Sequence, residues 1–208
     1  MGKLITPSIL SAMDFAKNAR GKWAESGKAS LIKQLSRIYD KEMPAPVRRG
    51  IDFENRVYQC ARKSPETWSA SKEFSQIVDR VRGGEFQAKA KRDLEVDGVS
   101  YTCYGKLDVL LPDEIVDIKT TNKYRPPGHY LKTAQHLIYT WAKHIPDFVY
   151  LVIVMDDNDK IIEVYEIDFT SPGEVEVENQ LIRTIRGFRE DLEIMGLTDL
   201  YLSKFCLY

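Results

Sequence analysis

Hydrophobic residues recur at helical spacing in the first third of the chain. In the stretch TPSILSAMDFAKNA, a Thr and a Ser precede Ile9, Leu10 and Met13, which lie on one face, so the pattern predicts a capped amphipathic helix. Two further segments have the same periodicity. The predicted helices run from about 8 to 19, 28 to 42 and 50 to 62, with a proline-containing break at 43–50 and a polar connection at 64–72.

From Phe86 onward the pattern changes to the alternation of β-strands. Two alternating runs meet at Asp97-Gly98, a dipeptide typical of hairpin turns, and EIVDIK is expected to add a third strand to this meander. A helix over 130–145, two strands and one long helix from about Ser171 follow. These elements predict an α/β (α+β) fold with a central mixed β-sheet of about five strands flanked by helices.

Length and composition place these elements in a single domain. A chain of 208 residues with 43% hydrophobic and 29% charged residues is typical of a globular protein with one sizeable core. We expect one domain over 1–208, with a helical part at 1–63, a sheet core at 73–170 and a C-terminal helix and tail at 171–208. No apolar run has the length of a membrane span, and the first residues lack the apolar core of a signal peptide. A cytoplasmic location without a membrane partner is therefore expected.

The patterns of Cys and His exclude several kinds of site. The three Cys residues are far apart and form no C-x-x-C pair, and the three His residues form no metal-binding motif. We therefore expect no disulfide framework, no zinc site and no iron–sulfur cluster. If the chain binds a metal ion, carboxylates must hold it.

Charge is spread unevenly along the chain, although the net charge is only −1. Residues 1–63 contain 13 Lys and Arg against 6 Asp and Glu, a balance of +7, whereas residues 147–199 contain 4 against 14, a balance of −10. A solvated acidic face explains this distribution equally well. The alternative is an N-terminal half and centre that face a polyanion, with the acidic end turned away.

The stretch LDVLLPDEIVDIK, residues 107–119, has the pattern of two short apolar strands but carries unexpected charges. With the Pro-Asp dipeptide at the tip of this hairpin, Asp108 lies opposite Asp117 unless the register slips by one residue. Directly opposed side chains have Cβ atoms about 5 Å apart. Two carboxylates at that distance repel by about 3 kcal/mol at an effective dielectric constant of about 20, a cost that a bound cation would remove. Lys119 projects on the same side as Asp117. A D-x-K triplet by itself also occurs by chance at solvated strand edges.

Two helical segments carry polar residues in or beside apolar stripes. In GIDFENRVYQCA, Glu54 falls in the middle of an apolar stripe, where a carboxylate is rare unless it is paired or coordinated. An arginine partner, such as Arg48 or Arg56, is an equally good explanation. In KTAQHLIYTWA, Gln135 and Tyr139 lie four residues apart beside an apolar stripe, a feature that is common on helix surfaces.

The order and spacing of these pieces resemble the PD-(D/E)XK nucleases. The similarity is greatest to the RecB-type exonuclease branch, which includes lambda-type exonucleases and the mitochondrial genome maintenance exonuclease, and it covers roughly residues 5–145. The middle acid is Asp rather than the more common Glu, a permitted variant, and the cysteine cluster of the iron–sulfur members is absent. The matching motifs are G-x-x-F-E at 50–54, G-x-x-D at 105–108, D-x-K at 117–119 followed by Thr120-Thr121, and Q-x-x-x-Y at 135–139.

The resemblance implies a restriction-endonuclease-like core and metal-dependent hydrolysis of phosphodiester bonds in DNA. Glu54, Asp108 and Asp117, with the Ile118 carbonyl, would bind one or two Mg²⁺ ions, for which Mn²⁺ would substitute. Lys119 would orient or deprotonate the attacking water or neutralise the developing charge. Glu114 is a rival metal ligand only if the hairpin register differs.

The resemblance also implies partners. The expected substrate is DNA with ends, and the expected activity is that of an exonuclease in recombination, repair or replication. A single-strand annealing or binding protein, and a second copy of the chain, are further candidate partners. The residues implied for DNA binding are Gln135, Tyr139, Thr121 and Lys132, with Lys123 and Arg125 as weaker candidates.

Two other functions fit the same motifs. A DNA-binding or partner-recruiting module on an inactivated nuclease fold would be expected to lack an acid or the lysine, and none is missing. A structure-specific or restriction-type endonuclease would retain all of these residues. A nucleotide-binding enzyme is disfavoured because the chain has neither a G-x-G-x-x-G motif nor a P-loop.

Overall fold

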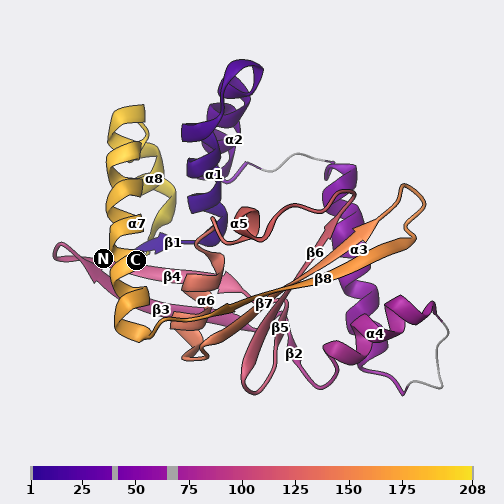
Figure 1. Cartoon of the computed structure of the whole chain (residues 1–208). Helices are drawn as coiled ribbons and strands as arrows, with labels where there is room; N and C mark the ends of the chain where they lie inside the picture. The colour runs from indigo at the N-terminus through magenta and orange to yellow at the C-terminus, as the bar shows by residue number, and fades with distance from the viewer. Residues whose placement is uncertain (1, 39–41, 65–69, 208) are drawn as a thin grey trace.

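The protein consists of two β-sheets with helices around them (Figure 1). A computed structural model describes residues 2–38, 42–64 and 70–207, so Tyr39 in the second predicted helix and most of the predicted polar connection lie outside the described residues. The strands are β1 (Gly2–Ile5), β2 (Glu85–Phe86), β3 (Lys89–Val96), β4 (Val99–Lys106), β5 (Val109–Leu110), β6 (Glu114–Thr121), β7 (Asp147–Met155), β8 (Ile161–Thr170) and β9 (Cys206–Leu207). The helices are α1 (Pro7–Asn18), η1 (Gly21–Trp23), α2 (Ala24–Ser36), α3 (Ala45–Ala61), α4 (Lys72–Arg80), α5 (Pro127–Tyr130), α6 (Gln135–Lys143), α7 (Glu174–Met195) and α8 (Thr198–Phe205).

The larger sheet has the strand order β2–β5–β6–β7–β8. β6 and β7 run parallel, whereas the β2–β5, β5–β6 and β7–β8 pairs are antiparallel. This arrangement confirms the predicted α/β (α+β) fold with a central mixed sheet of about five strands flanked by helices. Both neighbours of β6 matter for the candidate site, because β7 pairs with β6 along its whole length whereas β5 covers only two of its residues.

The second sheet, in the order β3–β4–β1–β9, corrects the sequence prediction. The turn at Asp97-Gly98 is confirmed, with φ values of 53° and 74° between β3 and β4. The three-stranded meander is wrong, because β4 pairs with β1 and the chain crosses to the other sheet between β4 and β5. β1 and β9 have four and two residues, too few for a hydrophobic period to reveal them.

The three predicted N-terminal helices are present with shifted ends. Thr6 caps α1, as predicted, because its hydroxyl accepts a hydrogen bond from the Ile9 N–H at 3.3 Å. α2 begins at Ala24 and ends at Ser36, and the next residue, Arg37, has a left-handed backbone. α3 begins at Ala45, inside the predicted break. A proline in the first helical turn is tolerated because no intrahelical partner needs its N–H.

Other helix predictions need larger corrections. α4 was not predicted, although Phe74, Ile77 and Val78 give it a buried face. The helix predicted over 130–145 is split, with α6 beginning only at Gln135. The long C-terminal helix ends at Met195, because Gly196, with a φ of 68°, interrupts it before α8. None of the described helices combines the length and apolar character needed to cross a membrane.

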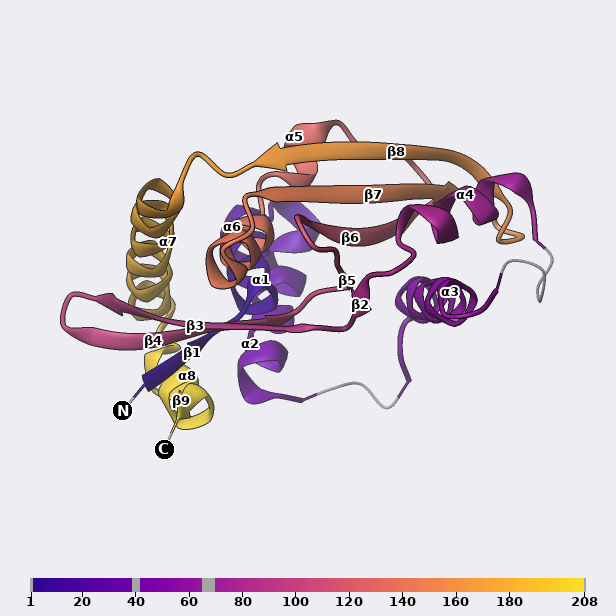
Figure 2. The same ribbon diagram turned by 90° about the horizontal axis from the view of Figure 1, so that it is seen from below.

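Two hydrophobic cores lie on opposite faces of the larger sheet. Val116 and Ile118 of β6 belong to one core with residues of α3 and α4, whereas Ile115 belongs to the other with α1, α6, α7 and the smaller sheet. In Figure 2, α3 and α4 lie on the right of the view, whereas α7 lies on the left and α1 and α2 lie between them. Because alternate strand residues face opposite ways, Asp117 and Lys119 project toward the α6 side.

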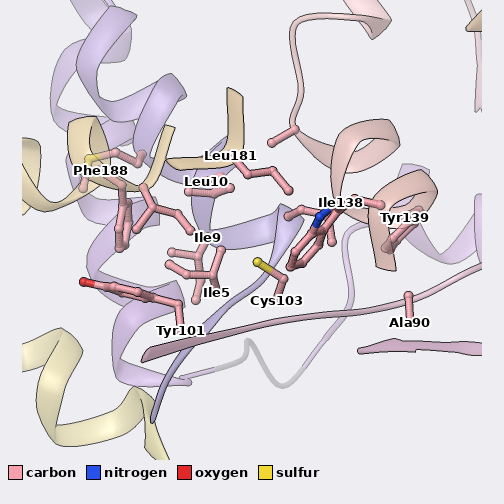
Figure 3. Packing of buried hydrophobic residues seen from close by; sticks show 14 of the residues in the cluster. Ile5, Ile9, Leu10, Ala90, Tyr101, Cys103, Ile138, Tyr139, Leu181 and Phe188 are labelled. Carbon is pink, nitrogen blue, oxygen red and sulfur yellow. The ribbon is translucent and has the colours of Figure 1, made fainter. Parts of the chain in front are cut away.

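Packing around Tyr139 explains the glycine of the G-x-x-D motif. Tyr139 lies in the larger core, together with the residues shown in Figure 3, and its hydroxyl donates to the Lys106 carbonyl at 2.9 Å. A Cβ atom at Gly105 would lie 2.4 Å from Cε1 of the Tyr139 ring. Position 105 therefore accepts no side chain while Tyr139 occupies its place.

This contact predicts the effect of Gly105→Ala. We expect the variant to lose about 1–3 kcal/mol of unfolding free energy, because the added methyl group overpacks the site. In a Tyr139→Leu background the same substitution should cost less, since the ring atoms are gone. Gly128→Ala is the matched control, because that Cβ meets nothing within 4 Å. Urea unfolding measures all four variants, and an equal cost of Gly105→Ala in both backgrounds would contradict the packing account.

His136 is a buried ionisable residue on α6. It is 4% exposed, its Nδ1 lies 3.2 Å from the Tyr150 hydroxyl, and burial lowers the pKa of its imidazole from 6.5 to about 4. Between these two pH values the unfolded chain binds a proton that the folded chain does not, so protonation favours unfolding.

The pH dependence of stability tests this assignment. As the pH falls from about 6.5 toward 4, the wild type should lose about 2–3 kcal/mol of unfolding free energy relative to His136→Asn. Urea unfolding of both proteins across this range measures the difference. A difference that does not change with pH would show that His136 is not held neutral by the fold.

Candidate functional site

The predicted hairpin register is confirmed. Val109 pairs with Val116, Leu110 pairs with Ile115, and the Leu111 N–H donates to the carbonyl of the residue that follows the turn, at 2.9 Å. Asp108 therefore precedes β5 at the level of Asp117, without a slip.

Glu114 lies at the other end of β6 and is tied down there. Its carboxylate accepts two hydrogen bonds from Arg80, at 2.8 and 2.6 Å, and Arg80 also binds Glu166 of β8. Glu114 would be a rival metal ligand only if the hairpin register were shifted, and the observed register is the predicted, unshifted one. Its charge is compensated by Arg80.

Asp108 takes the place of a strand partner at the open edge of β6. Pairing of β5 with β6 ends at Val109, and beyond it Oδ2 of Asp108 accepts the Ile118 N–H at 2.9 Å. The N–H and C=O of one strand residue face the same neighbour. The Ile118 carbonyl is therefore directed to the same edge as Asp108.

Asp117 and Lys119 lie side by side on β6. Asp117 is 1% exposed, forms an ion pair with the Lys119 ammonium, and accepts a hydrogen bond from Nε2 of Gln135, the first residue of α6. Oδ2 of Asp117 touches the ammonium but has no hydrogen bond of acceptable geometry among the described residues. Lys119 is 37% exposed and also lies 5.9 Å from the centre of the Tyr150 ring.

Glu54 reaches this edge from α3. A close approach of α3 to β6 is possible because position 50 is glycine, where a Cβ would lie 3.0 Å from Oγ1 of Thr120. Glu54 accepts a hydrogen bond from the Tyr58 hydroxyl at 3.5 Å. No ion pair among the described residues joins it to Arg48 or Arg56, and the Arg56 guanidinium lies over the Phe74 ring. The arginine-partner explanation is therefore not supported.

Burial and mutual repulsion perturb the carboxyl groups. Burial raises the pKa of Glu54 to about 7, with Lys119 opposing and Asp117 adding to the shift. Burial, and then the charge of Asp117, raise the pKa of Asp108 well above its usual value. For Lys119, burial acts to lower the pKa, but Asp117 and Asp108 outweigh it and raise the pKa. Three carboxylates thus share one ammonium group.

The residues present fit a hard divalent cation. Within the described ranges no three His, Cys, Asp or Glu side chains are grouped closely enough to hold a metal ion as they stand. Asp117 is turned toward Lys119 and Gln135, so a cation has to compete with Lys119 for it. Nevertheless, an all-oxygen set of one buried and two half-buried carboxylates that repel one another has the chemistry that Mg²⁺ or Mn²⁺ prefers, and one buried oxygen of Asp117 accepts no hydrogen bond among the described residues.

The residues predicted to bind DNA are placed differently from one another. Gln135 contacts Asp117 rather than standing free, and Tyr139 is buried against Gly105. Thr121 ends β6, where its hydroxyl donates to the Lys123 carbonyl at 2.9 Å. Lys132 precedes α6, so the prediction that it shares a helix with Gln135 is wrong. It lines a cavity of about 470 Å³ between α1, α7 and the α5–α6 connection.

Sequence reasoning missed three residues that surround the carboxylates. Tyr58 is spaced one helical turn after Glu54, a signal that was available. Tyr150 of β7 lies opposite Asp117, and its hydroxyl lies 3.1 Å from Oγ1 of Thr133. Gln87 lies in an irregular stretch between β2 and β3 and could not be found from a period.

Comparison with solved structures finds a protein with a fold similar to that of this chain. No protein-family model and no curated protein sequence matches the chain. Among solved structures, SSO0001 matches with a TM-score of 0.57 and 14% identity, over 91% of this chain and 77% of that chain. LHK-Exo in complex with dAMP has a TM-score of 0.47 and 14% identity, over 97% and 95% of the two chains. A phage-related exonuclease from Haemophilus somnus 129PT has a TM-score of 0.42 and 12% identity, over 91% of this chain and 95% of that chain.

Of these three similarities, the first exceeds a TM-score of 0.5, and at 14% identity it shows a shared fold alone. The mixed five-stranded sheet carries the D-x-K motif on β6, with G-x-x-F-E on α3 and Q-x-x-x-Y on α6, in the order that the resemblance predicts. The chain therefore shares its fold with SSO0001, and its motifs lie on the strands and helices in the order expected from the resemblance.

Proposed function

We propose that this protein is a metal-dependent nuclease that hydrolyses phosphodiester bonds of DNA, acting as an exonuclease. The observation that carries the proposal is the convergence of Glu54, Asp108, Asp117 and Lys119 at the open edge of β6. Each comes from a sequence motif with the matching order, and burial raises the pKa of Glu54 and Asp108, so that their ionised forms are disfavoured unless a cation is bound.

Glu54, Asp108 and Asp117, with the Ile118 carbonyl, would hold Mg²⁺ or Mn²⁺ in this protein. When bound, such an ion lowers the pKa of a bound water and stabilises charge on the phosphate oxygens. Asp108 is oriented for this purpose by the Ile118 N–H, and Asp117 by the Gln135 amide. Gln135 is thereby a positioning residue for Asp117 in addition to its proposed contact with DNA.

Lys119 supplies the positive charge of the site. Its ammonium lies against Asp117, so it can orient a water molecule or neutralise negative charge that develops on the phosphate. Tyr139 lies directly behind Gly105, and its hydroxyl is bound to the Lys106 carbonyl. Its part is to shape the wall of the site.

The choice of a nucleic acid as substrate is supported by charge near the site. A second cavity, also of about 470 Å³ and distinct from the one beside Lys132, is lined by Tyr139 and Lys106, together with Thr6, Ser8 and Arg37 from the region of α1 and α2. None of the described residues that line it carries a carboxylate, and the +7 segment 1–63 supplies part of the lining. An anionic strand is the ligand that such a surface favours.

Cleavage assays test the proposal. Purified protein should degrade end-labelled linear DNA with Mg²⁺ or Mn²⁺ and not with EDTA. Asp117→Asn should reduce the rate by more than the 10–100-fold that is typical of changes to outer-shell partners of a metal, because it removes a ligand. Lys119→Ala should be similarly impaired. Asp113→Asn, at the exposed tip of the same hairpin, is the matched control and should cleave normally.

The form of the DNA separates the alternatives. Degradation of linear but not closed circular DNA supports an exonuclease, whereas cleavage of the circle points to the structure-specific or restriction-type endonuclease. DNA binding with no cleavage under any metal condition would favour the inactive DNA-binding module. Full activity of Asp117→Asn would overturn the assignment of the site.

A further inference from the structure

Gln87 is held in an unusual backbone conformation next to Asp108. It has a φ of 57°, in the left-handed region that non-glycine residues other than Asn and Asp seldom adopt. Its N–H donates to the Asp108 carbonyl at 3.2 Å, and the adjacent Leu107 N–H donates to the Ala88 carbonyl at 2.8 Å. These bonds fix Gln87 where the chain crosses to β5, at the backbone of a proposed metal ligand.

The side chain of Gln87 continues this connection toward Glu54. Its Nε2 donates to the Tyr58 hydroxyl at 3.3 Å, and that hydroxyl donates to Oε2 of Glu54 at 3.5 Å. Tyr58 is 5% exposed, and its ring stacks on Phe86 with 4.6 Å between centroids. The Arg62 guanidinium lies over the Phe86 ring, 5.2 Å from its centre. The ring of Tyr58 is thus fixed independently of its hydroxyl.

A tyrosine hydroxyl has one proton to donate and can accept in return. Because Gln87 donates to the Tyr58 oxygen, the hydroxyl proton is directed to Glu54, and the three side chains form one directional series. Glu54 has no cationic partner in contact among the described residues, and α3 mainly packs on the opposite sheet face from Asp117. The direction in which the Glu54 carboxylate points therefore depends on Tyr58.

We propose that Tyr58, oriented by Gln87, is a positioning residue that directs the Glu54 carboxylate toward a divalent cation shared with Asp108 and Asp117. This inference rests on the proposed function. Metal-binding carboxylates generally need such hydrogen-bonding partners behind them, and their loss weakens metal affinity. Because both hydrogen bonds are long, the effect belongs at the lower end of that range.

Direct Mn²⁺ binding, measured by electron paramagnetic resonance or calorimetry, tests the proposal without relying on cleavage. Tyr58→Phe keeps the ring and its stack on Phe86 and removes the hydroxyl. We expect Mn²⁺ to bind this variant about 3–10-fold more weakly. The Mn²⁺ concentration needed for half-maximal cleavage should rise by the same factor, with little change of rate at saturating Mn²⁺. A purely structural role of Tyr58 would not produce this split.

Gln87→Asn provides a second, independent variant. Asn tolerates the left-handed backbone but is too short to reach the Tyr58 hydroxyl. It should weaken Mn²⁺ binding in the same direction, and adding Tyr58→Phe to it should cost less than Tyr58→Phe alone, because the two residues act through one contact. If Tyr58→Phe does not fold, Gln87→Asn carries the test.

Two controls separate the outcomes. Tyr101→Phe removes a hydroxyl that is buried without a hydrogen-bond partner in the described structure, and it should leave Mn²⁺ binding unchanged. Asp117→Asn should abolish tight binding. If Asp117→Asn weakens binding but Tyr58→Phe and Gln87→Asn bind Mn²⁺ as the wild type does, the positioning role is wrong and the metal site stands. If Asp117→Asn also binds normally, both this inference and the proposed function fail.

Discussion

Three carboxylates and one ammonium group share the open edge of β6, and burial raises the pKa of two of the carboxyls, Glu54 and Asp108. Such charges are costly away from water unless they are paired. The same strand shows how this chain compensates charge elsewhere, because Glu114 at its other end receives two hydrogen bonds from Arg80. At the candidate site no arginine among the described residues forms an ion pair with Glu54, Asp108 or Asp117. The remaining negative charge is what a bound cation would neutralise, and the proposed chemistry depends on it.

The fold produces this concentration of charge through the shortness of β5. A longer β5 would pair with β6 beyond Val116, and the Ile118 N–H would bind a backbone carbonyl instead of Asp108. Because the pairing of β5 with β6 ends there, Glu54 of α3 from one face and Gln135 of α6 from the other both reach this edge of β6. Two glycines allow the close contacts, Gly50 beside Thr120 and Gly105 beside the Tyr139 ring. Their positions in the motifs thus follow from packing around the site.

Much of this could be predicted from the sequence, for identifiable reasons. The register of the hairpin follows from the Pro-Asp tip and the period of two, so the positions of Asp108 and Asp117 were accessible. The second sheet was not, because β1 and β9 are very short and the change of sheet after Lys106 leaves no hydrophobic signature. Nor could hydrophobic periodicity locate Gln87, because this residue lies between two strands and its side chain is placed by a left-handed backbone conformation. Lys132 was misplaced because the helix starts later than its amphipathic pattern does.

The central claim is that Asp108 opposes folding without a cation and supports it with one. The most direct test is the unfolding free energy of the wild type and of Asp108→Asn, measured with urea in EDTA and in Mg²⁺. Asn keeps an acceptor for the Ile118 N–H, so charge is the main difference. The account predicts that in EDTA the variant is as stable as the wild type or more stable, and that saturating Mg²⁺ stabilises the wild type by about 2–3 kcal/mol and the variant much less. A variant that is several kcal/mol less stable in EDTA and gains as much from Mg²⁺ as the wild type would contradict it.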